Sequence, residues 1–334
     1  MARFVVRRLL LLIPILLGLS LLLFLWVRAL PGGPADALLG ERSSPGARER
    51  IERLYGLDRP LWEQYLTYLR RAVTLDLGTS VRSQRPVLTE FGERFPATIE
   101  LALSALLIAI VVGIPLGYFA ARRFGTWLDN VSVTASIIGV TIPVFFLGYL
   151  LRYVFAVRLQ WLPATGRQDP RLDAEHPTGF YVLDGLITGN MAAFWDAIEH
   201  LILPAIALAS IPLAIIVRIT RASVLDVLNE DYVRTAEAKG LLRRTISRRH
   251  VLRNAMLPVA TTIGLQAGLL LSGAILTETV FAIPGIGTYL ANAIETRDYS
   301  AIQGSILIIA VIYVFVNLAV DVSYGLIDPR VRVT

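Results

Sequence analysis

Six long apolar stretches constrain this chain more than any other feature. They cover approximately residues 9–30, 98–121, 131–157, 201–222, 257–281 and 302–325. Each has few or no charges through its centre. A helix needs about 20 apolar residues to cross a hydrocarbon core of roughly 30 Å, whereas transmembrane β-strands are alternating segments of about ten residues. The pattern, in a chain of 334 residues that are 55% hydrophobic, predicts an all-α polytopic membrane protein with six transmembrane helices.

The long 31–97 connection contains ten arginines that are nearly balanced by acids, and loops longer than about 60 residues are discounted in assigning orientation. Among the other connections between these stretches, the positive charges fall on alternate ones. The basic connections carry Arg3, Arg7, Arg8, Arg122, Arg123, the arginines from Arg218 to Arg253, Arg330 and Arg332. The 158–199 and 282–301 loops instead carry more acidic than basic residues. Because cytoplasmic loops are enriched in Lys and Arg, both termini are expected in the cytoplasm. The net charge of +6 therefore reflects membrane topology, and nucleic acid is not an expected partner.

The chain divides into three parts by composition. Residues 1–30 form the first transmembrane helix, whose apolar run is too long for a cleaved signal segment. Residues 31–97 are polar, with an amphipathic run at Ile51, Leu54 and Tyr55 and turn residues further on, and predict a small extracytoplasmic helical insertion between helices 1 and 2. A solvated linker is the alternative. Residues 98–334 form a core of five transmembrane helices, with a cytoplasmic loop at 223–256.

That cytoplasmic loop predicts two helices joined by a glycine turn. Apolar residues from Leu225 to Ala238 fall close to one helical face, and Gly240 suits a helix C-terminal stop. A second helix is expected through Thr245 to Arg253. Such a rigid projection can sit in the groove of a partner protein. A basic loop held against anionic lipid headgroups is the other interpretation, and both can hold together.

An ordered series of motifs along nearly the whole chain resembles one family. The series includes 28–34 (RALPGGP), 76–80 (DLGTS), 94–101 (RFPATIEL), 161–166 (WLPATG), 230–240 (EDYVRTAEAKG), 250–258 (HVLRNAMLP) and 321–330 (DVSYGLIDPR). Together they resemble bacterial ABC-importer permeases of the dipeptide/oligopeptide/nickel branch, and in particular its "B" type inner-membrane subunit. The general importer motif begins Glu-Ala-Ala, where this chain has Arg234, Thr235 and Ala236. This departure is typical of the peptide branch.

The resemblance implies a type I ABC importer permease that forms half of a translocation pore for peptides in the bacterial inner membrane. It also implies four kinds of partner: a homologous second permease subunit, two P-loop ATPase subunits that hold ATP and Mg, an extracytoplasmic substrate-binding protein and membrane lipid. The loop would couple the pore to the ATPases. The expected coupling residues are Glu230, Tyr232, Arg234, Thr235, Ala236, Ala238, Lys239 and Gly240.

Spans three and five are expected to line the translocation pathway. The candidate pathway residues are Thr141, Pro143, Phe145, Gln266 and Glu278. Ionisable groups within a membrane are costly and usually face a bundle interior or a watery cavity, which makes Glu278 a candidate gate or vestibule residue. A structural role is the alternative for Glu278. For Gln266, a hydrogen bond across a subunit interface is the alternative.

The chain lacks the motifs of an enzyme. It has no G-x-x-x-x-G-K-[ST] loop to hold ATP phosphates, no nucleophile elbow and no His/Glu cluster with metal-ligand spacing. We therefore expect a non-catalytic subunit with no catalytic residues, no cofactor and no metal of its own. Other hypotheses stay open: the same importer carrying nickel or another small solute, a stand-alone secondary transporter, or a scaffold that recruits ATPases.

Overall fold

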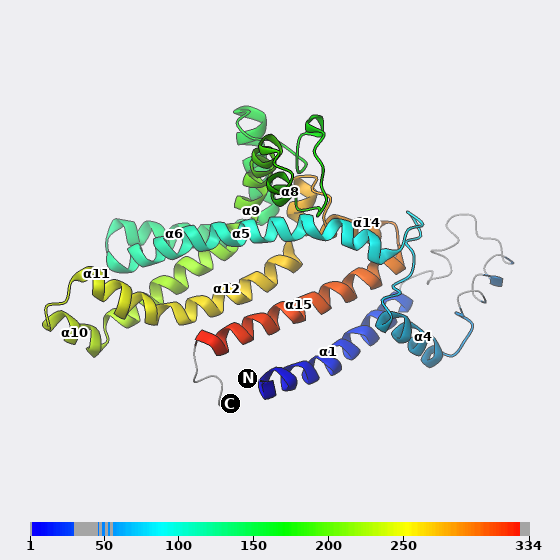
Figure 1. Ribbon diagram of the computed structural model, residues 1–334, viewed down its shortest axis with the longest axis horizontal. Coiled ribbons are helices and arrows are strands. Elements are labelled where there is room, and N and C mark those ends of the chain that lie inside the picture. Colours follow the sequence, from blue (N-terminus) through cyan, green and yellow to red (C-terminus); the bar gives the residue numbers. More distant parts are fainter. Residues whose placement is uncertain (1, 30–45, 47–48, 51–52, 54–55, 328–334) are drawn as a thin grey trace. The chain divides into compact units, whose positions relative to one another are not determined.

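The computed structural model describes residues 2–29, 46, 49–50, 53 and 56–327, and this part of the chain is nearly all helical (Figure 1). The one β pairing among these residues is an isolated bridge between Thr79 and Pro86. The structure therefore confirms the all-α class. The amphipathic run expected at Ile51, Leu54 and Tyr55 lies outside the described residues.

Four described helices are long and apolar enough to cross a membrane. They are α1 (Ala2–Ala29), α5 (Val87–Arg122), α9 (Met191–Leu228) and α15 (Tyr299–Ile327). A fifth span results if α6 (Trp127–Thr141) is counted together with α7 (Val144–Leu151) and the π-helix η1 (Arg152–Arg158). The two parts of that segment are bent by 102° at a break that includes Pro143, because proline lacks the amide hydrogen of a continuous helix.

The span expected at 257–281 is divided in two. It consists of α12 (Arg253–Gly273) and α13 (Ile275–Val280), and neither is among the helices that qualify as spans within the described part of the chain. The all-helical class and up to five spans are therefore present, and the count of six stays a prediction.

One compact unit combines Met1–Pro96 with Pro284–Phe315. It contains α1, α4 (Leu61–Val73) and α14 (Ile286–Glu295). Asp298, just before α15, accepts hydrogen bonds from the Ser80 hydroxyl at 2.6 Å and from the Val81 amide at 2.9 Å. Its other oxygen accepts from the Ala301 amide at 3.1 Å and so caps the start of α15. One buried carboxylate thus joins a loop and a helix more than 200 positions apart in sequence.

The second unit combines Ala97–Ile283 with Val316–Thr334, and α9 is its central helix. Helix α9 packs against α6, α7, α12 and α8 (Tyr181–Ile187). Its buried face is rich in alanine, including Ala205, Ala207 and Ala209, and small residues let helices approach closely within a membrane. The approach is closest at Gly117 of α5, where a Cβ atom would lie 2.6 Å from the Val217 carbonyl oxygen.

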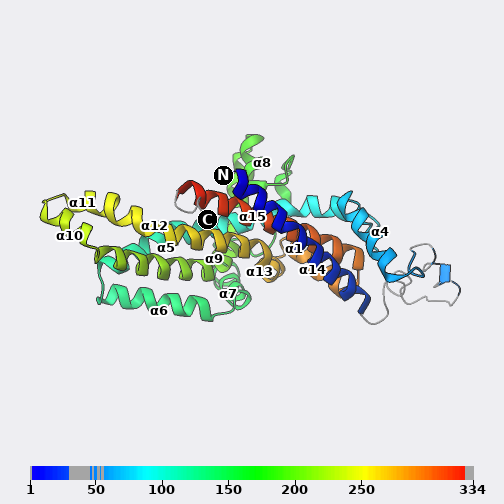
Figure 2. The ribbon, with the colours of Figure 1, turned by 90° about the horizontal axis from the view of Figure 1, so that it is seen from below.

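The two ends of α9 carry different structures (Figures 1 and 2). Its N-terminal end lies beside α8 and the 158–190 segment, which includes the 3₁₀ turn η2 (Pro170–Leu172). We call residues 158–190 the cap. Its C-terminal end continues into α10 (Asp231–Ala238), α11 (Arg243–Thr245) and the π-helix η3 (Ile246–Leu252). We call residues 229–252 the projection.

Candidate functional site

The projection is a pair of short helical segments with a well-defined turn. Helix α10 ends at Ala238, and Gly240 follows with a φ of +73°. The Gly240 amide donates to the Glu237 carbonyl at 2.9 Å and the Leu241 amide donates to the Ala236 carbonyl at 3.3 Å. This pair of bonds is a Schellman motif, which needs a left-handed residue at the glycine position. The structure confirms the expected helix stop at Gly240.

A small apolar cluster holds the projection against the helices that carry it. Val233 and Ala236 of α10 pack with Ile246 and Val251 of η3, and all four are at least 95% buried. The same cluster includes the buried side chains Ala121, Val224 and Ala255 of α5, α9 and α12. The projection is therefore continuous with the membrane helices through packed side chains. A displacement of α10 would be transmitted to them, because packed interiors transmit strain.

The outer face of the projection is polar, and most of its cations have no ion-pair partner among the described residues. Its exposed cations are Arg234, Lys239, Arg243, Arg244, Arg248 and Arg249. In the described part of the chain, one of these cations forms an ion pair. Arg234 lies 3.7 Å from Asp231, and both of these side chains are largely exposed. Such pairs contribute little to stability. The cations are therefore available to a partner surface or to anionic lipid.

Seven of the eight expected coupling residues lie on the outside of this structure. Glu230, Tyr232, Arg234, Thr235, Ala238, Lys239 and Gly240 are exposed. Ala236 is 5% exposed and packs inward, so it can act only through packing. The Tyr232 hydroxyl accepts a hydrogen bond from the Asn254 side chain at 2.9 Å, which joins α10 directly to the start of α12.

A buried charged pair near the same end of α9 was missed by the sequence reasoning. Asp129 of α6 is 2% exposed and accepts two hydrogen bonds from the Arg221 guanidinium of α9, at 2.5 and 2.9 Å. It also accepts from the Gly125 amide at 3.0 Å. A bidentate arginine–carboxylate pair fixes both position and orientation. The signal in the sequence was an acid in the first turn of an apolar segment, but its partner lies 92 positions away.

The expected pathway residues fall into two groups. Thr141, Pro143 and Phe145 are exposed at the bend between α6 and α7. Gln266 and Glu278 are buried within the second unit, with exposed fractions of 8% and 0%. The Glu278 carboxylate accepts a hydrogen bond from the Thr98 hydroxyl of α5 at 2.6 Å, and the Arg152 guanidinium donates to the Val280 carbonyl at 2.8 Å. Both bonds tie α13 into the unit.

The cap at the other end of α9 is held by a buried ion pair. The Arg167 guanidinium donates to a Glu100 oxygen at 2.7 Å and to the Gly179 carbonyl at 2.8 Å. The second Glu100 oxygen accepts from the Val182 amide at 2.8 Å. Arg167 and Glu100 are each 8% exposed. The Arg167 side chain and the Val182 amide of the cap are thereby hydrogen-bonded to Glu100 of α5.

An aromatic stack extends this arrangement. The His176 ring lies parallel to the Tyr181 ring with centroids 3.6 Å apart, and the Arg167 guanidinium lies 3.7 Å from the same Tyr181 centroid. The two must occupy opposite faces of the ring, since both cannot fit on one. Burial lowers the pKa of His176 below its usual value, against the opposing influence of Asp184, whose carboxylate lies 3.9 Å away.

The described residues define the chemical character of the site. Among residues 2–29, 46, 49–50, 53 and 56–327, no group of three His, Cys, Asp or Glu side chains has the geometry to hold a metal ion. The arrangement consists of membrane helices, a rigid polar projection at one end of α9 and a fastened cap at the other. That arrangement defines a class: a polytopic helical membrane protein with a polar projection packed against its spans.

Comparison with known proteins identifies the family within this class. The family described as "Binding-protein-dependent transport system inner membrane component" matches residues 113–333, and its N-terminal counterpart matches residues 1–102. The chain belongs to this family of ABC-importer permeases, in the branch that contains the dipeptide permeases.

The curated relatives match over nearly their whole length. The dipeptide transport system permease protein of Alkalihalophilus pseudofirmus is 46% identical over 332 residues, which covers 99% of this chain and 100% of that protein. The dipeptide transport system permease protein of Escherichia coli K12 is also 46% identical, with 99% of each chain covered. A structure of the MetNI methionine ABC transporter in an inward-facing conformation matches 70% of this chain and 93% of its own chain, with a TM-score of 0.51 and 14% identity. That last likeness supports the fold alone.

Proposed function

We propose that this chain is a pore-forming permease subunit of an ATP-driven peptide importer in a bacterial inner membrane. The observation that carries the proposal is the match over the full length of the chain to dipeptide transport permeases at 46% identity. Its partners would be a homologous permease, two P-loop ATPase subunits and an extracytoplasmic substrate-binding protein. ATP and Mg would be bound in the ATPases, and both termini of this chain would lie in the cytoplasm.

The projection is the element through which the ATPases would act. Its exposed face offers cations, most of them without an ion-pair partner among the described residues, and its buried face is packed against α5, α9 and α12. Closure of the ATPases would displace α10, and the apolar cluster around Val233 and Val251 would pass that displacement to the membrane helices. Glu230, Tyr232, Arg234, Thr235, Ala238, Lys239 and Gly240 would form the contact, and Ala236 would support it from inside.

The pathway would run along the bend between α6 and α7. The exposed residues Thr141, Pro143 and Phe145 suit a surface that is completed by the second permease. Glu278 is fully buried and hydrogen-bonded to Thr98, so we assign it the role of fixing α13 in place beside this surface. Gln266 is placed with it, inside the bundle.

The coupling assignment is tested by Gly240→Pro in the complete assembly reconstituted into vesicles. Proline fixes φ near −65° whereas Gly240 has +73°, and the substitution also removes the amide that bonds to Glu237. We expect uptake of a dipeptide to fall at least about tenfold, because the turn can no longer form. ATP hydrolysis and membrane insertion should persist.

A matched control exists at the opposite end of α9. Gly189 has a φ of +70°, and, as at Gly240, no atom lies within 4 Å of an added Cβ. Gly189→Pro should therefore impose a similar backbone strain without separating hydrolysis from uptake. Normal uptake in Gly240→Pro would exclude the projection as the coupling element.

The substrate assignment requires a competition experiment. ATP-dependent uptake of a labelled dipeptide should be inhibited by unlabelled dipeptides and tripeptides, and not by nickel ions. Uptake driven by an ion gradient without ATPase subunits would instead support a secondary transporter, and ATPase recruitment without any uptake would support a scaffold.

A further inference from the structure

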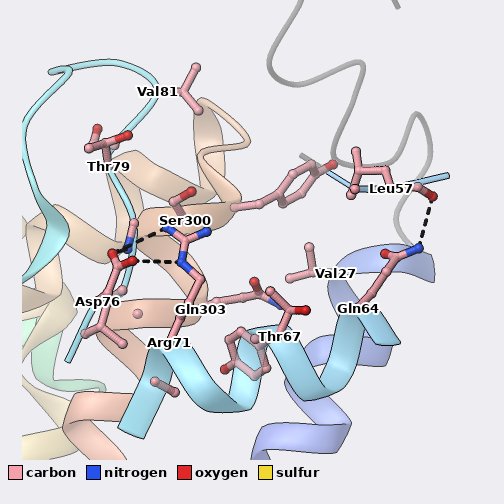
Figure 3. Close-up of a pocket in the computed structure, with 18 of the residues that line it drawn as sticks. Val27, Leu57, Gln64, Thr67, Arg71, Asp76, Thr79, Val81, Ser300 and Gln303 are labelled. Carbon is pink, nitrogen blue, oxygen red and sulfur yellow. Dashed lines mark hydrogen bonds and ion pairs between the residues drawn. The ribbon is translucent and has the colours of Figure 1, made fainter. Parts of the chain in front are cut away.

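A cationic pocket lies in the first unit, beside the C-terminal end of α1, and no role in coupling or in the pathway has been given to it. It has a volume of about 550 Å³ and is lined by residues of α1, the described residues that precede α4, α4 itself, the 74–84 loop and the start of α15 (Figure 3). Among the described residues, four arginines line it, Arg28, Arg53, Arg59 and Arg71, against a single acidic residue, Asp76. The pocket is therefore strongly positive.

The best-positioned of these cations is held in place without a counter-ion. The Arg28 guanidinium donates two hydrogen bonds to the Gln64 side-chain oxygen, at 2.8 and 3.1 Å, and a third to the Phe24 carbonyl at 3.3 Å. The Gln64 amide is in turn fixed by the Leu57 carbonyl at 3.0 Å, a bond visible in Figure 3. No carboxylate of the described residues lies within ion-pair distance of Arg28.

Two further polar groups at the pocket are incompletely partnered. The Tyr68 hydroxyl is buried and has no hydrogen-bond partner among the residues described. The guanidinium of Arg59 likewise makes no hydrogen bond in that part of the chain. Arg71 is paired with Asp76 at 2.9 Å, an interaction marked in Figure 3, and Arg53 is paired with Glu49 at 3.8 Å. Arg28, Arg59 and Tyr68 are left for a ligand. Buried polar groups without partners are uncommon and call for an explanation.

The pocket borders an apolar surface that is continuous with a transmembrane helix. Helix α4 exposes Leu61, Trp62, Leu66 and Val73, with exposed fractions of 54–79%, on one side of the helix. The outer turns of α1 expose Leu21, Leu22, Leu25 and Trp26. An amphipathic helix with exposed tryptophan and leucine beside the end of a span is typical of the membrane interface.

We propose that α4 lies in the interfacial region of the outer leaflet of the inner membrane. We further propose that the pocket binds the phosphate of an anionic phospholipid whose acyl chains pack along the exposed faces of α1 and α4. The fork of a guanidinium matches phosphate oxygens, and Arg59 supplies such a fork. Arg28 already donates to Gln64 and Phe24 and contributes its positive charge. The Tyr68 hydroxyl donates to a phosphate oxygen and so gains a partner. The assignment to the outer leaflet depends on the proposed topology, with the N-terminus in the cytoplasm.

The test uses the fluorescence of Trp62 in the assembled transporter, reconstituted into phosphatidylcholine vesicles with a minor fraction of phosphatidylglycerol. Bromine atoms on the acyl chains of one lipid or the other quench nearby tryptophans. Subtracting the signal of a Trp62→Phe variant isolates Trp62 from the other four tryptophans. At equal bromine content, brominated phosphatidylglycerol should quench Trp62 more strongly than brominated phosphatidylcholine.

Two variants test whether the pocket causes this preference for the anionic lipid. Arg59→Gln and Arg28→Gln should each reduce the preference for the anionic lipid roughly fivefold, the effect expected for one cation near a membrane surface. The control is Arg70→Gln, an exposed arginine of the same helix that does not line the pocket. It should keep the preference. Since the Arg59 side chain makes no hydrogen bond to any described residue, its variant should retain the structure even if Arg28→Gln does not.

Three results would overturn the proposal. Equal quenching by both lipids would mean that the pocket does not select a headgroup. An equal loss in Arg70→Gln and Arg59→Gln would mean that general surface charge attracts the lipid. Loss of quenching when the substrate-binding protein is added would assign this face to a protein. The measurement needs no ATP and no uptake, so its failure is distinguishable from failure of the importer function.

Discussion

The cap and the projection occupy opposite ends of α9 and are stabilised in opposite ways. The cap is fastened by charged and polar groups, Arg167 with Glu100 above all, that are almost completely buried. The projection is fastened by small apolar side chains around Val233 and Val251, and its charged side chains are exposed. Removing one partner of a buried charged pair leaves an uncompensated charge, whereas truncating an apolar side chain leaves a cavity. The comparison teaches that a charged pair fixes the cap and apolar packing fixes the projection.

The largest effect should come from breaking the ion pair of the cap. Arg167→Gln leaves Glu100 buried with one of its oxygens lacking a cation, and the loss of one partner of such a pair typically costs 3–5 kcal/mol. Hydrogen exchange should show this at the Val182 amide, which donates to Glu100.

The control is the same substitution at an exposed pair. Arg171 pairs with Asp169 through a side chain that is 91% exposed, so Arg171→Gln should leave exchange in the cap nearly unchanged. Equal protection of Val182 in wild type and Arg167→Gln would contradict the description of the cap as fixed by this pair.

A smaller effect is expected in the core of the projection. Val233→Ala removes two buried methyl groups and should destabilise α10 by about 2 kcal/mol. Hydrogen exchange of residues 231–238 reports the change. Leu242→Ala serves as the control, because Leu242 is 76% exposed in the same projection. If both variants behaved alike, the apolar cluster would not be what holds α10.

The turn after α10 should show a more modest effect. Gly240→Ala places a Cβ in the left-handed region, at a cost of roughly 1–2 kcal/mol. Asparagine tolerates this conformation better, so Gly240→Asn should restore most of the protection lost at the Leu241 amide. An alanine variant with unchanged exchange would show that the Schellman motif does not limit the stability of the turn.

The smallest effect concerns pH and belongs to the cap. Burial lowers the pKa of His176 in the folded state, so its protonation favours the unfolded state. Stability should be complete above pH 6.5, the ordinary value, and should decline as pH falls below it. Asp184 and Glu100 face the imidazole and raise its pKa, whereas Arg167 lowers it.

Protease nicking of the cap, measured above and below pH 6.5, should detect this decline. His176→Gln should remove the dependence on pH over that range. A decline that persists in His176→Gln would point to another titrating group.

Much of this protein could be predicted from the order of its residues. The apolar stretches predicted a helical membrane protein, because a helix makes all of its backbone hydrogen bonds within one segment of the chain inside the bilayer. Gly240 predicted where α10 ends, because glycine adopts the left-handed backbone conformation without a steric penalty. The motif series gave the family. These features are local, or are repeated often enough along the chain to be recognised without contacts.

The tertiary structure alone decided which distant residues meet. Asp129 and Arg221 are 92 positions apart, Glu100 and Arg167 are 67 apart, and Ser80 and Asp298 are 218 apart. No periodicity marks such partners, since each pairing depends on how whole helices pack. The same is true of the 102° bend at Pro143, where sequence indicates only a kink. Local chemistry therefore determined the elements, and packing determined which of their side chains became buried pairs.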